Sequence, residues 1–175
     1  AVERWPAVLK AELRARRERL DQALREAGTG LPADRGFQDQ LSRALVFSDF
    51  VAESLVRDPL LLDRLRVSGA LSQPPAAGSH ASRLAACLEG ADGIDDLVGR
   101  LRRFRREEMV RIAWRDLNGL AGLAETTSDL SDLADACLNQ TLARLYARQC
   151  ADQGAPFAAD GRPMELVVLA LGKLG

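Results

Sequence analysis

The chain has 175 residues, of which 47% are hydrophobic and 28% charged, which is ordinary usage for a globular protein. A chain of this length is expected to form one domain, or one domain and the edge of a second. Its formal net charge of −1 argues against a general binder of nucleic acid or of anionic membranes.

The cysteines and the hydropathy pattern exclude further classes. The three cysteines are far apart and form no CxxC pair, which argues against a disulfide framework or a zinc site. No apolar run is long enough to span a bilayer. We therefore expect a cytoplasmic protein that binds neither membrane nor nucleic acid.

Apolar periodicity and helix breakers predict a series of helices in the first half of the chain. Residues 5–27 and 37–57 are amphipathic, and Ser48 could cap a fresh start that divides the second segment in two. Asp58-Pro59 interrupts the pattern, because proline disfavours the helical conformation in the residue before it. A short helix through about Val67, a Gly- and Pro-rich loop and a helix at 82–89 follow.

Two polar features of this part are interpreted as structural. The run of Arg14, Arg16, Arg17 and Arg19 predicts a solvated helix face. His80 is the only histidine, and no Ser/His/Asp or metal-ligand spacing surrounds it. It is therefore predicted to be a surface or helix-start histidine.

Residues 94–150 predict two long helices joined by a turn at Asn118-Gly119. The second helix is expected to begin at Thr126 or Thr127, because Thr126 and Asp129 have the spacing of a capping box. Its predicted core stripe is Leu130, Leu133, Ala134, Cys137, Leu138, Thr141 and Leu145.

The first of these helices carries charges within or near its apolar face. Isolated charges are costly to bury, so these residues are expected to pair, Arg105 with Glu108 and Glu108 with Arg111. Two interpretations stay open: an internal ion-pair network that fixes packing, or an arginine that reaches an acidic or phosphate group. The outward set, Arg100, Arg102, Arg103 and Arg106, is interpreted as a solvated face. The possible network comprises Arg105, Glu108, Arg111, Arg115 and Asp116.

An apolar run, MELVVLAL at 164–171, is bounded by Pro163 and Gly172 and predicts a buried strand. This strand has no predicted partner in the chain. Either it pairs with another copy, or the rest of its sheet lies beyond Gly175. The fold class predicted is mainly α, with a helical region at 1–160 and the start of a second domain at 161–175.

Three stretches resemble the family of bifunctional glutamine synthetase adenylyltransferase/adenylyl-removing enzymes. They are LRRFRREEMVRIAWRDLNG at 101–119, LSDLADACL at 130–138 and MELVVLALGKLG at 164–175. Asp58-Pro59 also fits a feature of that family. The resemblance implies an N-terminal piece from the half that removes AMP from glutamine synthetase by phosphorolysis. Glutamine synthetase and a PII-type signal-transduction protein are the partners that it implies.

The resemblance also implies a polymerase-β-type nucleotidyltransferase sheet, which the strand at 164–171 would begin. Gly172, Lys173 and Gly175 would belong to its nucleotide-binding turn, with Lys173 where many relatives of the wider superfamily carry serine. The intact enzyme would use Mg²⁺ and a nucleotide or phosphate. The Asp-x-Asp that would hold the metal is expected about a dozen residues after Gly175. We therefore expect the 175 residues alone to be inactive, with no cofactor, no metal site and no catalytic residue of their own.

A different class of function also fits the pattern. The Arg-rich stretch at 100–106 could dock an acidic partner, which would make the chain a stand-alone helical interaction module.

Overall fold

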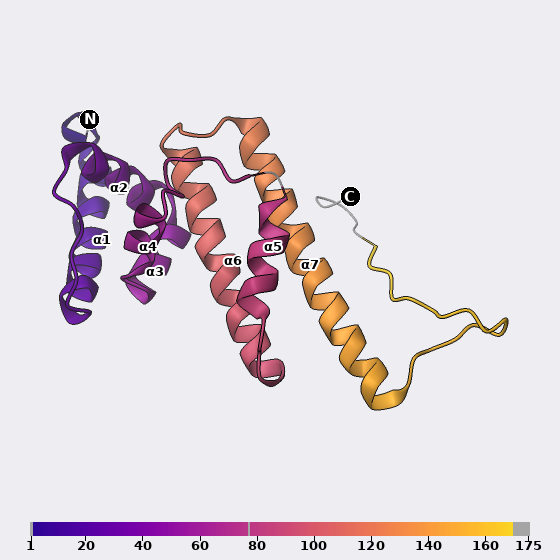
Figure 1. The fold of residues 1–175 in the computed structure, drawn as a ribbon. Helices are drawn as coiled ribbons and strands as arrows, with labels where there is room; N and C mark the ends of the chain where they lie inside the picture. The colour runs from indigo at the N-terminus through magenta and orange to yellow at the C-terminus, as the bar shows by residue number, and fades with distance from the viewer. Residues whose placement is uncertain (1, 77, 170–175) are drawn as a thin grey trace. The chain divides into compact units, whose positions relative to one another are not determined.

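The computed structural model describes residues 2–76 and 78–169 (Figure 1). Over these residues the chain is mainly helical, which confirms the predicted mainly α class. No helix of the described part is both long and apolar enough to cross a membrane. After a 3-10 helix, Val2–Arg4, come α1 (Ala7–Glu26), α2 (Arg35–Phe47), α3 (Asp49–Arg57), α4 (Leu61–Val67), α5 (Ser79–Leu88), α6 (Gly93–Leu117) and α7 (Leu123–Gln153).

The chain divides into two compact units, which are described separately. Unit 1 combines Ala1–Ala77 with Arg102–Leu130, and unit 2 combines Gly78–Leu101 with Ser131–Gly175. Both α6 and α7 therefore contribute residues to each unit.

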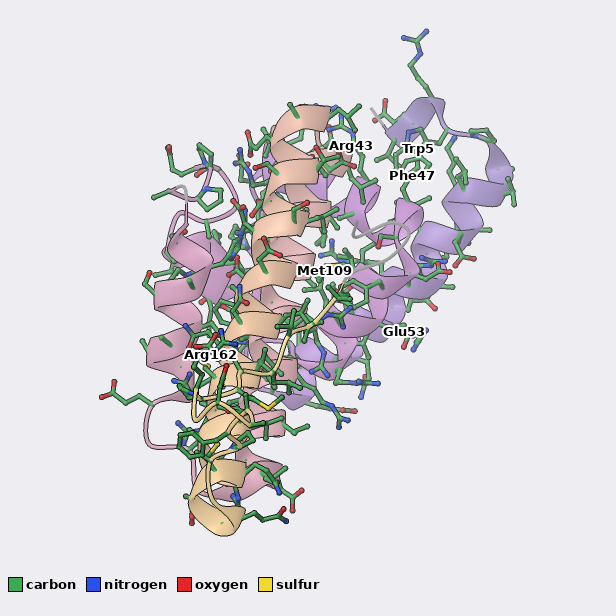
Figure 2. The ribbon with its side chains drawn as sticks, turned by 90° about the vertical axis from the view of Figure 1, so that its right-hand side faces the viewer. Trp5, Arg43, Phe47, Glu53, Met109 and Arg162 are labelled. Carbon is green, nitrogen blue, oxygen red and sulfur yellow. The ribbon has the colours of Figure 1, made fainter. Side chains whose placement is uncertain are left out.

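The core of unit 1 is made mostly of leucine and gathers around Trp114, which is fully buried. The rings of Trp114 and Phe37 lie 5.5 Å apart, a spacing at which aromatic pairs attract. A second ring pair, Trp5 and Phe47, has its centroids 5.5 Å apart in an edge-to-face arrangement (Figure 2). The main buried leucines are Leu20, Leu24, Leu41, Leu45, Leu55, Leu61, Leu62, Leu65 and Leu71.

Local capping signals divide the helices of unit 1 much as the sequence predicts. Ser48 Oγ accepts a hydrogen bond from the N–H of Val51 at 3.2 Å, so residues 37–57 do form two helices. Asp58 ends α3, and α4 begins at Leu61. The interpretation of Ser48 as a helix start is confirmed.

The arginines of α1 are not simply a solvated face. Arg16 donates to the carbonyl oxygen of Leu45 at 2.7 Å and pairs with Asp49 at 2.6 Å. Arg19 donates to both carboxylate oxygens of Glu53, at 2.9 and 3.2 Å. These side chains therefore bind α1 to α2 and α3, because a long arginine can lay its stem on the core and extend its guanidinium to a neighbouring helix.

Unit 2 packs α5 against the first turns of α6 and the later turns of α7. Its buried residues include Leu84, Leu88, Leu97, Leu133 and Ala136. His80 lies in the first turn of α5, which agrees with the predicted helix-start position. Its side chain is buried and not at the surface.

Arg100 closes the carboxyl end of α5. It donates to the carbonyl oxygens of Cys87 at 3.3 Å and Glu89 at 2.8 Å, and it pairs with Asp96 at 2.9 Å. A cation at this position also complements the negative end of the helix dipole. The hydrogen bond from Arg100 to Asp96 raises the pKa of the arginine.

The predicted strand at 164–171 is not formed over 164–169, and residues 170–171 lie outside the described part of the chain. The segment is exposed, and the one β-bridge nearby joins Phe157 and Pro163. A strand needs a neighbour for its backbone N–H and C=O groups. Since the described residues offer none, the apolar run stays irregular.

Asp58 is held by a bidentate pair with Arg64, at 2.7 and 3.2 Å. This hydrogen bonding lowers the pKa of Asp58 below its usual value. A carboxyl whose folded pKa is depressed stabilises the fold above its unfolded pKa of about 3.9, and this contribution is lost as pH falls through the folded pKa.

We expect Asp58→Asn to lower the free energy of unfolding at pH 7 by about 0.5–1 kcal/mol, because the pair is partly exposed. The variant should also lose less stability than the wild type between about pH 5 and pH 2. Urea unfolding across this range measures both effects. Asp63→Asn is the control, since Arg66 reaches Asp63 through only one carboxylate oxygen at an exposed site. Parallel curves for wild type and Asp58→Asn would contradict the prediction.

Candidate functional site

The candidate site lies in unit 1, where α6 ends and α7 begins. Gly119 adopts a left-handed φ of +66°, as predicted for the residue after a helix end. The N–H of Leu120 donates to the carbonyl of Arg115 at 2.8 Å, and the N–H of Gly119 to that of Asp116 at 3.0 Å. The last carbonyls of α6 are thus satisfied, and α7 can begin a few residues later.

Arg111 is the centre of the site. Its Nε donates to Glu108 at 2.9 Å, and its Nη2 donates to both carboxylate oxygens of Asp129 at 2.7 Å. The side chain of Arg111 is 1% exposed, that of Glu108 0% and that of Asp129 5%. One guanidinium therefore joins a carboxylate of α6 to a carboxylate of α7, away from solvent.

Arg115 makes a second set of contacts one turn later. Its Nε and Nη2 donate to Glu125 at 3.1 and 2.8 Å. It also donates to the carbonyl oxygens of Leu71 at 3.4 Å and Leu120 at 3.1 Å. Arg115 thus fastens α7 and the turn before it to the segment that follows α4.

The predicted capping box of α7 is wrong. The helix begins at Leu123, and the N–H of Thr126 already donates to the carbonyl of Gly122 at 3.0 Å. Asp129 faces Arg111, and the hydroxyl of Thr126 donates to Asp116 at 3.1 Å. Asp129, which the local sequence pattern assigned to a helix cap, instead forms an ion pair with Arg111.

The structure brings together only part of the predicted ionic set. Glu108 and Arg111 are adjacent and paired, and Arg115 is buried beside a different acid, Glu125. Asp116 is exposed and accepts a hydrogen bond from the hydroxyl of Thr126, apart from the two arginines. Arg105 is exposed and lies outside this buried network.

Burial decides what this arrangement can do chemically. A group that binds substrate or transfers a proton must be reached by it, and Arg111 and Glu108 are closed to solvent. The geometry favours an ion-pair network that fixes how the two helices pack, not an arginine that meets a phosphate. Arg111 Nη1 and Trp114 Nε1 are buried here with no hydrogen-bond partner in the described part of the chain.

Sequence reasoning missed Asp129 and Glu125 as partners of the arginines. The signal lay in the register of α7, where Asp129, Leu133 and Ala136 recur at helical spacing and are all buried. An acidic residue on the same helix face as two buried apolar residues is expected to pair with a buried cation and not to cap the helix.

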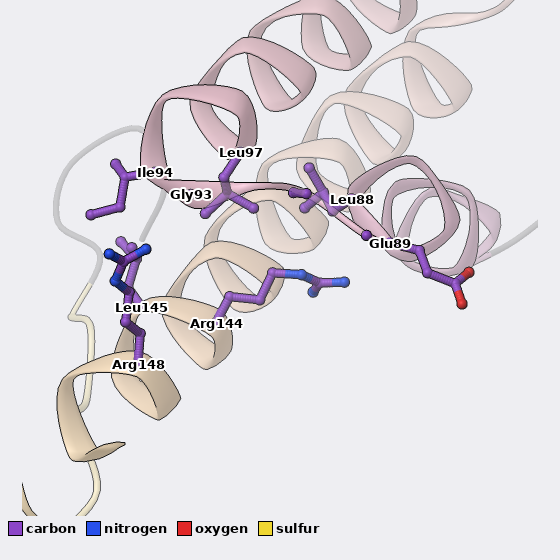
Figure 3. Close-up of a pocket in the computed structure, with 10 residues that line it drawn as sticks. Leu88, Glu89, Gly93, Ile94, Leu97, Arg144, Leu145 and Arg148 are labelled. Carbon is purple, nitrogen blue, oxygen red and sulfur yellow. The ribbon is translucent and has the colours of Figure 1, made fainter. Parts of the chain in front are cut away.

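Unit 2 contains a cavity of about 330 Å³ between the α5–α6 turn and α7 (Figure 3). Its walls combine apolar side chains, among them Ile94 and Leu145, with the guanidinium groups of Arg144 and Arg148. Arg144 donates to Gln140 Oε1 at 2.5 Å and to the carbonyl of Ala85 at 3.4 Å. Because Arg144 is committed to the protein and the first turn of α6 is acidic, the cavity is not a built anion site.

The predicted nucleotide-binding turn, Gly172, Lys173 and Gly175, lies outside the described residues. Within the described ranges no cluster of three or more His, Cys, Asp or Glu side chains could hold a metal ion.

Comparison with known proteins identifies the family. A family model described as "Glutamate-ammonia ligase adenylyltransferase" matches residues 38–175. The chain belongs to this family. The match includes α6, α7 and all the paired residues of the candidate site.

Curated relatives extend the similarity to nearly the whole chain. A protein of Pseudomonas aeruginosa is 43% identical over 97% of the chain, and one of Nitrosococcus oceani is 37% identical over 99%. A third, from Thioalkalivibrio sulfidiphilus, is 41% identical over 85%. Each is named a bifunctional glutamine synthetase adenylyltransferase/adenylyl-removing enzyme. The chain spans only 15–18% of the length of these relatives.

We expect Arg111→Met to lower the free energy of unfolding by about 3–5 kcal/mol, because two carboxylates would remain buried without their cation. Arg105→Met is the matched control and should change it by less than about 0.5 kcal/mol, since Arg105 is exposed. Urea unfolding followed by circular dichroism measures both. Equal costs for the two substitutions would show that the buried network does not hold the helices.

Proposed function

We propose that this chain is part of an enzyme that adenylylates and deadenylylates glutamine synthetase, and that it comes from the half that removes AMP. The observation that carries the proposal is the 43% identity over 97% of the chain to a protein of that name, together with the family match. The resemblance of residues 101–119 and 164–175 to the adenylyl-removing half supports the assignment to that half.

In this proposal the helices form the scaffold beside a nucleotidyltransferase site. The segment 164–171 becomes the first strand of the sheet once the longer chain supplies its neighbours. Gly172 and Gly175 let the backbone N–H groups approach a phosphate closely, and Lys173 adds a positive charge. An oxygen of inorganic phosphate attacks the phosphorus of the AMP group, the bond to the tyrosine oxygen breaks, and ADP and free tyrosine result.

The metal of such an enzyme has no place among the residues described here. Phosphoryl-transfer sites hold Mg²⁺ with carboxylates, and the described residues include no suitable cluster. In this proposal the longer protein supplies the carboxylates that hold Mg²⁺ and binds the nucleotide. We place that protein in the cytoplasm, with glutamine synthetase and a PII-type protein as its partners.

If the metal-binding carboxylates belong to the longer protein, as proposed, the 175 residues alone should not release AMP. The test incubates this chain with adenylylated glutamine synthetase and phosphate and measures ADP. The full-length protein is the positive control. Phosphate-dependent ADP formation by the short chain would show that the catalytic groups lie within it.

Lys173 offers a test in the full-length protein. Lys173→Ala should slow phosphate-dependent AMP removal by about 10- to 100-fold, the effect of losing one charged hydrogen bond to phosphate. AMP attachment should change little, since the resemblance assigns it to a second site. Lys10→Ala, at the other lysine of these 175 residues, is the matched control. Equal loss of both activities in Lys173→Ala, or of neither, would count against the assignment to the AMP-removing half.

A stand-alone interaction module is the second candidate. It is favoured by the exposure of Arg102 and Arg103 on α6. Charge reversal at Arg102, Arg103 and Arg106 that abolished binding of an acidic partner to these 175 residues would support it.

A further inference from the structure

In unit 2, α7 is apolar on two sides. Leu133 and Ala136 are buried on the side that packs within the unit. Ala134, Leu138, Leu142 and Leu145 follow at spacings of four, four and three residues, which places them on one other face. We call these four residues the outer face of α7. Leu138 is 43% exposed. Leu145 is 40% exposed and lies at the border of this face, because it also lines the cavity between the α5–α6 turn and α7.

The predicted core stripe of α7 mixed these two sides. It included Leu138 and Leu145, which are exposed, and it omitted Ala136, which is buried. Charged residues flank the outer face, since Asp135 and Arg148 lie three residues from Leu138 and Leu145. A surface helix usually turns charged and polar residues toward water, so the leucine-rich stripe between these charges is a candidate for a covered surface.

The C-terminal segment already lies beside this helix. The hydroxyl of Tyr146, which adjoins Leu145 in the sequence, donates a hydrogen bond to the carbonyl oxygen of Met164. The bridge between Phe157 and Pro163 turns the chain back toward α7 before this contact. Beyond Met164 the run Leu166, Val167, Val168 and Leu169 is exposed as well. One hydrogen bond thus joins the start of the exposed run to α7, one residue from Leu145 in the sequence.

We propose that the outer face of α7 is the docking surface for residues 164–169 and for the sheet that they begin in the longer protein. The inference rests on the proposed function for the identity of that sheet. Its occupant is a segment of the same chain, because residues 154–163 tether the run to α7 and give it an effective concentration near the millimolar range. The relatives, of which this chain spans 15–18%, have the length to supply the remaining strands.

The full-length protein tests this proposal by hydrogen exchange. Leu138→Glu with Leu145→Glu should speed exchange in residues 164–169 by about tenfold or more while α5 stays protected. Leu138→Met with Leu145→Met keeps the face apolar and should leave exchange unchanged. Ala147→Glu adds a charge at an exposed position of α7 outside the outer face and should also change nothing. Unchanged exchange in the double Glu variant would overturn the proposal.

A second measurement needs no variant. Hydroxyl-radical oxidation of wild-type Leu138 and Leu145 should be almost completely suppressed relative to the urea-unfolded protein. Oxidation in proportion to their 43% and 40% exposure would overturn the proposal. Light scattering tests whether a second copy of the chain occupies the face instead. If the wild type is a dimer that the double Glu variant splits, and exchange at 164–169 is unchanged, the face belongs to a second copy and the proposal is overturned.

These readouts separate the two proposals. Protection of residues 164–169 in a full-length protein that fails to release AMP would refute the proposed function and leave the docking surface standing. Normal AMP release by a full-length protein whose Leu138 and Leu145 are oxidised in proportion to their exposure would refute the docking surface and leave the proposed function standing.

Discussion

The buried guanidinium of Arg111, between Glu108 and Asp129, is the interaction on which the junction of α6 and α7 depends. Removing three charges from water costs several kcal/mol for each ion, and only good geometry and further hydrogen bonds repay it. The contact therefore permits one register of α7 against α6. Arg115 extends the same restraint to Glu125 and to the carbonyl of Leu71, so α6, α7 and the segment that follows α4 meet around two arginines.

The other ion pairs of unit 1 differ from this network in kind. The pairs of Arg19 with Glu53 and of Arg64 with Asp58 lie at the surface, where solvent competes and each contributes little. They align helices that the leucine core already holds together. Arg111 and Arg115, by contrast, lie inside the protein, where a shifted helix would leave a charge without a partner. We therefore infer that the buried charges of α6 select one arrangement of the packed helices.

The helices could be read from the sequence because their signals are local. Ser48 accepts from a backbone N–H three residues later, and Asp58-Pro59 ends a helix by its own sterics. The start of α7 could not be read this way, because Asp129 satisfies both a capping pattern and an arginine 18 residues away. Likewise, Leu138 and Leu133 look alike in a hydropathy pattern, and only the three-dimensional packing shows which of them is buried.

The absent strand has the same origin as the uncovered face of α7. A strand exists only with its neighbours, and an apolar helix face is stable only when covered. Residues 166–169 and Leu138 are exposed, and the hydrogen bond from Tyr146 to Met164 joins the start of the run to α7. Ordering the strand would therefore cover the helix, and covering the helix would orient the strand.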